Sequence, residues 1–132
     1  ISIYSILENT INRICLTYQA SIENPVKMKD LEANGIIDQG RRYLEKVVLL
    51  DFPTNHKSWK EITKIQQIRN SFAHAAGHVE TGNRDLIKYI NQSQYLELKN
   101  NKIEILNGFS EHCLSTFEEF FNELFTRMEA SK

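Results

Sequence analysis

The sequence contains few residues of the kinds that break helices or cross-link chains. Its 132 residues include two prolines, five glycines and two cysteines. So little proline and glycine favours helix over irregular structure. Cys15 and Cys113 lie far apart, each among apolar residues at helical spacing, which predicts reduced core thiols of an intracellular, cytoplasmic protein rather than a disulfide framework.

Long apolar runs and a strong net charge are missing too. The longest apolar run is Val47–Leu50, far too short to span a membrane, and no signal peptide is evident, so we expect no membrane partner. The net charge of −1 gives no overall attraction to nucleic acids. The length suits a single domain over residues 1–132. The first residue is Ile1 rather than methionine, as in an excerpt of a longer protein.

The charges that are present are unevenly spread. Residues 57–88 contain six lysines and arginines against three acidic residues, whereas residues 104–132 contain two against six. The basic half is mild support for an anionic ligand there, and a solvated helix face explains it almost as well.

Apolar residues recur at helical spacing over most of the chain. Ser58 and Glu61 have the form of a capping box, Ser110 suits a helix start, and Gly77 suits a left-handed helix stop. The last stretch carries a broad aromatic stripe, which we interpret as core packing with a part available to a dimer interface. The predicted helices cover about 2–20, 36–50, 58–76, 84–90 and the segment from 110 onward.

A change of period before the last helix predicts a β-hairpin. Leu96 and Leu98 alternate with polar residues, as do Ile103 and Ile105. Asn100-Asn101 suits a two-residue turn because asparagine tolerates positive φ. This register places Leu98 opposite Ile103 and Leu96 opposite Ile105, with a longer loop as the alternative.

The candidate functional residues are Arg69, Asn70 and His74. Asn70 and His74 are four residues apart and share a helix face. Arg69 and His74 are five apart and point about 140° away from each other on a straight helix. Either the helix bends at this point, or a second copy of the chain completes the site.

Simpler interpretations of these residues stay open. His74 could interact with the carbonyl groups at the helix end, and Arg69 could belong to a surface ion pair. His74 and His78 have a spacing that suits two zinc ligands. Because no third or fourth ligand is evident, we expect neither a metal nor a cofactor.

Arg69-Asn70-x-x-x-His74 resembles the signature of the HEPN superfamily, small all-helical domains of which many are ribonucleases. The resemblance covers most of the chain, including the stretch 29–44, Trp59 and the segment 68–70. It implies an all-α fold, a four- to five-helix up-and-down bundle of HEPN type, here with a small β-hairpin before the last helix.

The resemblance also implies a function. HEPN nucleases act as homodimers whose two motifs face each other, and they cut RNA without metal. By this resemblance His74 is a general acid/base, Arg69 a phosphate clamp and Asn70 an orienting residue. The protein is then expected to be an endoribonuclease, with the toxin of a toxin–antitoxin pair or an antiviral effector as its biological role. The alternative is a non-catalytic dimerisation or accessory module that binds a partner protein.

Overall fold

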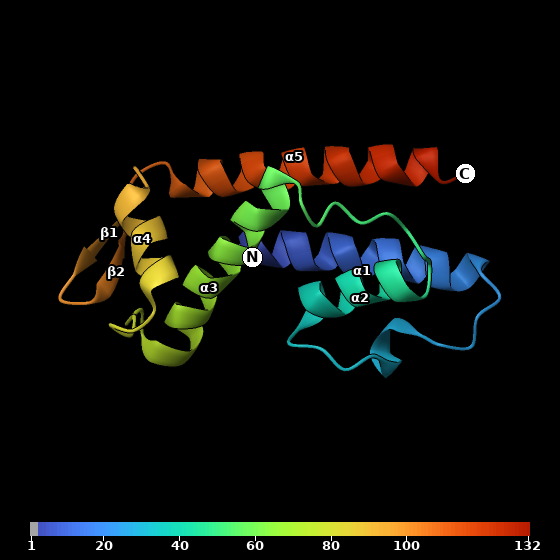
Figure 1. The fold of residues 1–132 in the computed structure, drawn as a ribbon, viewed down its shortest axis with the longest axis horizontal. Helices are drawn as coiled ribbons and strands as arrows, with labels where there is room; N and C mark the ends of the chain where they lie inside the picture. Colours follow the sequence, from blue (N-terminus) through green and yellow to red (C-terminus); the bar gives the residue numbers. More distant parts are fainter. Residues whose placement is uncertain (1–2) are drawn as a thin grey trace. The chain divides into compact units, whose positions relative to one another are not determined.

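The computed structural model describes residues 3–132, and within them the chain forms five α-helices, one 3₁₀ turn and one hairpin (Figure 1). The predicted helical fold with a hairpin before the last helix is therefore confirmed; the start predicted at residue 2 lies outside the described residues. In chain order the elements are α1 (Ile3–Ser21), η1 (Met28–Asp30), α2 (Ile36–Lys46), α3 (Lys57–Ala75), α4 (Arg84–Gln92), β1 (Leu96–Lys99), β2 (Lys102–Ile105) and α5 (Phe109–Ala130).

The chain divides into two compact units. Unit 1 comprises the described part of Ile1–Thr54 together with Phe121–Lys132, and unit 2 comprises Asn55–Phe120. Unit 2 is thus inserted into unit 1 in the sequence, and α5 begins in one unit and ends in the other. None of the helices within residues 3–132 has the length and apolar character needed to cross a membrane.

In unit 1, α1 and α2 pack closely at Gly40. A Cβ atom built on Gly40 would overlap the Ile11 Cγ2 methyl group, so only glycine fits this position. The Cys15 thiol lies beside it, 3.7 Å from the Gly40 carbonyl oxygen. Ile11 and Cys15 belong to the buried stripe of α1, with Tyr4 and Leu7.

The exposed side of α2 carries a small ionic network. Asp38 Oδ1 accepts a hydrogen bond from Arg41 at 2.8 Å, and Asp38 Oδ2 accepts one from Arg42 at 3.1 Å. Partial burial alone would raise the pKa of Asp38, but hydrogen bonds from Arg41, the Asn34 backbone and Arg42 together lower it. The carboxylate therefore stabilises the first turns of α2 in its charged form.

The prediction that α2 continues to about Leu50 was wrong, because the helix ends at Lys46. Val47 and Val48 are β-branched and add little helix propensity. Leu49 then takes a left-handed conformation with φ of 62°, and the Leu50 amide donates back to the Leu44 carbonyl at 2.8 Å. The apolar run that extended the predicted helix is a helix-terminating turn.

In unit 2, α3 and α4 share a core with the hairpin, which lies against α4 in Figure 1. The buried members of this core are Ile68, Val79, Leu86, Ile90, Leu96 and Ile103. The hairpin has the predicted register, with Leu96 opposite Ile105 and Leu98 opposite Ile103. Asn100 and Asn101 both have positive φ, at 53° and 63°, as the two-residue turn requires.

Two predicted capping residues were wrong, although both helices begin close to the predicted positions. His56, not Ser58, caps α3: its side chain accepts from the Ser58 amide, and Ser58 lies inside the helix. Helix α5 begins at Phe109, so Ser110 lies within its first turn. Serine is favoured at helix starts in general, but here His56 and Gly108 are the residues directly before the two helices. Glu61 is consequently not part of a capping box.

Candidate functional site

The last turns of α3 border a hollow of about 340 Å³ that contains part of the predicted site. Asn70 and His74 both line it, as their spacing of four predicted, and both residues are exposed. His78 and Glu80 complete the side beyond the helix end. The hollow therefore brings an amide and two imidazoles to one surface.

The chain leaves α3 by a left-handed turn that places His78. Ala76 has a φ of 51° and Gly77 a φ of 86°, so Gly77 adopts the positive φ expected of a helix stop. His78 Nδ1 lies 3.0 Å from the Ala75 carbonyl oxygen. A carbonyl oxygen only accepts, so Nδ1 carries the proton and Nε2 of a neutral ring is left as an acceptor. His78 thus makes the contact with the helix-end carbonyls that was considered for His74.

Arg69 does not join Asn70 and His74. It is exposed, but it is not among the described residues that line the hollow. Helix α3 continues without interruption from Lys57 to Ala75, so the angle of about 140° between Arg69 and His74 is retained. Two arrangements were expected from the sequence: a bend in the helix, or a second copy of the chain. A bend in α3 does not bring the Arg69 guanidinium to the His74 imidazole.

The electrostatic character of the hollow is not that of a complete anion site. Its described lining includes one carboxylate, Glu80, and neither a lysine nor an arginine. A phosphate there would need positive charge from elsewhere. His74 and His78 also fall short of a metal site, since no three His, Cys, Asp or Glu side chains among residues 3–132 gather in a way that could hold an ion.

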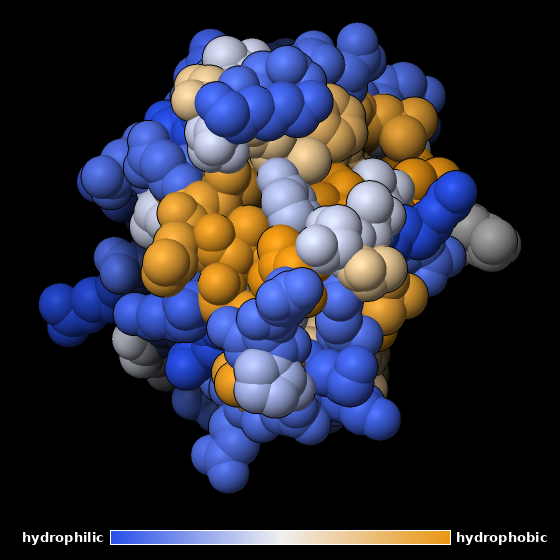
Figure 2. All heavy atoms as spheres, turned by 90° about the vertical axis from the view of Figure 1, so that its right-hand side faces the viewer, coloured by the Kyte–Doolittle hydropathy of each residue, from blue (hydrophilic) through white to orange (hydrophobic). Residues whose placement is uncertain are grey.

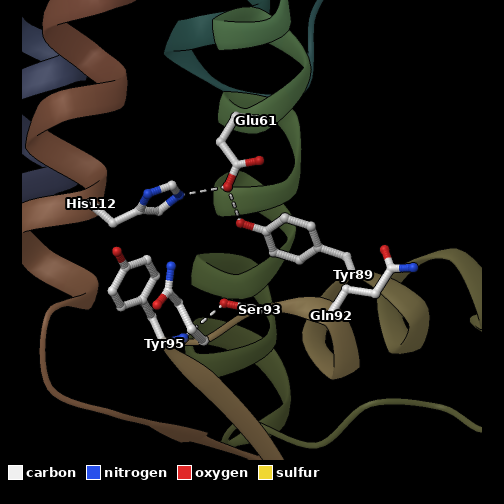
Figure 3. A pocket seen from close by; sticks show the side chains of 7 residues that line it. Glu61, Tyr89, Gln92, Ser93, Tyr95 and His112 are labelled. Carbon is white, nitrogen blue, oxygen red and sulfur yellow. Dashed lines mark hydrogen bonds and ion pairs between the residues drawn. The ribbon is translucent and has the colours of Figure 1, made fainter.

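A second hollow, of about 550 Å³, lies between the start of α3, the end of α4 and the start of α5, all within unit 2 (Figure 3). Glu61 is one of its lining residues. The Glu61 Oε2 atom accepts a hydrogen bond from the Tyr89 hydroxyl and lies 2.7 Å from His112 Nε2. The Tyr95 ring stacks on His112 with ring centroids 5.0 Å apart.

The protonation of this group follows from its geometry. Burial, and then the hydrogen bond to Glu61, raise the pKa of Tyr89 far above its usual range, so its hydroxyl stays a donor. A carboxylate only accepts, so His112 Nε2 carries a proton and Nδ1 of the neutral ring is an acceptor. Glu61 fixes the tautomer and orientation of His112, as carboxylates do beside many catalytic and metal-binding histidines.

Sequence patterns did not indicate this second group of side chains. Tyr89 and His112 lie 28 and 51 residues from Glu61, so no local spacing connects them. Comparison of the chain with models of protein families, with curated proteins and with solved structures finds no match in any of the three.

Proposed function

We propose that the protein is a metal-independent endoribonuclease that acts as a homodimer. The observation that carries the proposal is the exposure of Asn70 and His74 on one face at the end of α3, beside a hollow that is open to a ligand. The HEPN-like Arg69-Asn70-x-x-x-His74 motif supports the same activity, with a toxin of a toxin–antitoxin pair or an antiviral effector as the biological setting.

In the proposed reaction a ribose 2′-hydroxyl attacks the adjacent phosphorus. The base removes the 2′ proton, the O2′–P bond forms, and the P–O5′ bond breaks. The departing 5′ oxygen takes up a proton, which leaves a 2′,3′-cyclic phosphate and a 5′-hydroxyl. His74 gives or takes the proton, since imidazole does both near neutral pH. Asn70 orients the hydroxyl or the ring.

Arg69 has a part in this reaction only if a second chain takes part. Because the hollow has no lysine or arginine in its described lining, we propose that Arg69 of one protomer reaches the Asn70–His74 face of the other across a two-fold axis. Its guanidinium then binds two phosphate oxygens and stabilises the charge that develops in the transition state.

The direct test is incubation of the purified chain with RNA in EDTA, with analysis of the product ends. We expect 2′,3′-cyclic phosphate ends, and a loss of roughly 100-fold or more in rate for His74→Ala and for Arg69→Ala. Arg13→Ala removes an exposed arginine from α1 and serves as the charge-matched control. Cleavage that is unchanged in both site variants would refute the assignment.

A mixing experiment tests the two-chain site. The His74→Ala chain keeps Arg69, and the Arg69→Ala chain keeps His74. A mixed dimer of the two restores one complete site of two, so random mixing should recover about a quarter of the native activity. Mixtures with no more activity than either variant alone would exclude a site shared between chains.

A second candidate, a non-catalytic module that binds a partner protein, is favoured by exposed apolar side chains. Figure 2 shows hydrophobic side chains at the surface among hydrophilic ones. In unit 1 the side chains of Leu49 and Phe125 are 78% and 44% exposed. Under this candidate the chain has no nuclease activity, and Leu49→Asp or Phe125→Asp abolishes capture of the partner.

A further inference from the structure

The second hollow is large enough for a small ligand, and aromatic rings form part of its lining. Its volume of about 550 Å³ lies within the range of small-molecule sites, roughly 300–1,000 Å³. Three of its described lining residues carry rings: Tyr89, Tyr95 and His112. In Figure 3 the rings of Tyr89 and Tyr95 are seen largely face-on. Such walls favour a flat ligand that can stack.

The charge of the lining argues against an anion. Its described residues include neither lysine nor arginine, and the one carboxylate, Glu61, accepts hydrogen bonds from Tyr89 and His112 through a single oxygen. Desolvating a phosphate here would not be compensated by positive charge. A neutral ligand fits the lining better.

The polar groups around the rings can recognise the edge of a heterocycle. The Gln92 and Gln94 amides each offer donors and an acceptor, and the Ser93 hydroxyl offers one donor. When the His112 ring carries a single proton, Nδ1 is a further acceptor, since Nε2 faces Glu61. This combination of ring walls with mixed donors and acceptors matches the faces and edges of a nucleobase.

The backbone around Tyr95 supports this geometry. The Tyr95 amide donates to Ser93 Oγ at 3.0 Å, and a Cβ atom on Gly108 would lie 2.9 Å from the ring. Gly108 also has a φ of 95°, which favours glycine. The ring position therefore depends on a residue without a side chain at the start of α5.

We propose that this hollow binds a nucleobase, either of a free nucleoside or of single-stranded RNA. The base stacks on the Tyr95 ring, and the Gln94 amide contacts its edge. The site lies at the opposite end of α3 from His74, and its occupancy does not depend on RNA cleavage.

The test is an NMR titration of the full chain with adenosine, guanosine, cytidine and uridine in turn. We expect saturable shifts of the Tyr95 and His112 signals with at least one nucleoside. Tyr95→Ala should weaken binding by roughly tenfold or more, because stacking on an aromatic ring is lost. Tyr95→Phe keeps the ring and should bind almost as the native chain does.

Two further variants keep the result interpretable. Gln94→Ala changes an exposed lining residue without touching the core and should weaken binding or change the preferred base. Asn91→Ala, exposed on α4 and outside the lining, is the matched control and should bind normally. No saturable shift with any nucleoside at millimolar concentration, or equal affinity of the native and Tyr95→Ala chains, would overturn the proposal.

A short single-stranded RNA distinguishes the two sources of the base. The measurement uses the His74→Ala chain, so that the RNA stays intact whether or not the native chain is a nuclease. Tighter binding of the RNA than of any nucleoside, lost in Tyr95→Ala, identifies a strand as the ligand. Equal or weaker binding of the RNA identifies the free nucleoside. If the native chain does not cleave RNA, the nucleoside titration and the RNA-binding measurement still test nucleobase binding.

Discussion

Glu61 and His112 lie 51 residues apart in the sequence, and their side chains meet with His112 Nε2 2.7 Å from Glu61 Oε2. The same oxygen accepts from Tyr89, so one carboxylate connects α3, α4 and α5. Both Glu61 and His112 are about three-quarters buried, with side-chain exposures of 27% and 29%. The contact therefore bears on stability as well as on ligand binding.

Removing the carboxylate should destabilise unit 2. In Glu61→Ala the Tyr89 hydroxyl and His112 Nε2 lose their acceptor, which costs about 1–3 kcal/mol in the free energy of unfolding. Urea denaturation measures the difference, and Glu111→Ala on the exposed side of α5 is the control. An unchanged midpoint for Glu61→Ala would show that water replaces the carboxylate without cost.

Adding one methyl group at Gly40 should destabilise unit 1. The methyl overlaps Ile11, so α1 and α2 must move apart, at a cost of about 1–3 kcal/mol that outweighs the gain in helix propensity. Gly82→Ala is the control, because a Cβ atom there has nothing within 4 Å. Thermal unfolding compares the two, and equal melting temperatures would contradict the close packing.

The two thiols should be unreactive in the folded chain. Burial raises the pKa of Cys15 to about 12, and burial together with the nearby Glu61 charge raises the pKa of Cys113 to about 12. Only the thiolate reacts with disulfide reagents. We expect slow labelling of both cysteines at neutral pH and fast labelling in guanidinium. Rapid modification of the folded chain would mean that the thiols are accessible.

Acid should remove the contribution of Asp38. Its pKa in the folded chain is lowered, so the carboxylate stabilises the fold above the unfolded pKa of about 4, and this stability is lost as the pH falls through the folded value. Asp38→Asn should lower the free energy of unfolding by about 1 kcal/mol at pH 7.

The difference between native and Asp38→Asn chains should shrink as the pH is lowered below about 4. Glu32→Gln, at an exposed position before α2, should show no comparable change and controls for the loss of one negative charge. A difference that stays constant down to acidic pH would show that the hydrogen bonds do not depend on the charge of Asp38.

The parts of the fold that depend on neighbouring residues were predictable. The hairpin register follows from alternation and from two asparagines that accept positive φ, and the structure has that register. The pairing of Asn70 with His74, and the separation of Arg69 from them, follow from helix geometry alone.

The parts of the structure that depend on distant residues, or on which of several residues caps a helix, were not predictable from the sequence. The serine pattern at residues 58 and 110 is compatible with a helix start, but His56 and Gly108 occupy the position before the first turn. The Glu61–Tyr89–His112 group is assembled by the packing of three helices, which no spacing in the sequence encodes.

The insertion of unit 2 within unit 1 has a consequence during synthesis on the ribosome. Unit 2 possesses all its residues once Phe120 has emerged, whereas unit 1 lacks Phe121–Lys132 until later. α1 and α2 are therefore synthesised before unit 1 is complete, whereas the inserted unit can already complete its core. A nascent chain arrested with Phe120 outside the ribosome and Phe121–Lys132 still inside it should resist protease within Asn55–Phe120 before it does so within the preceding segment.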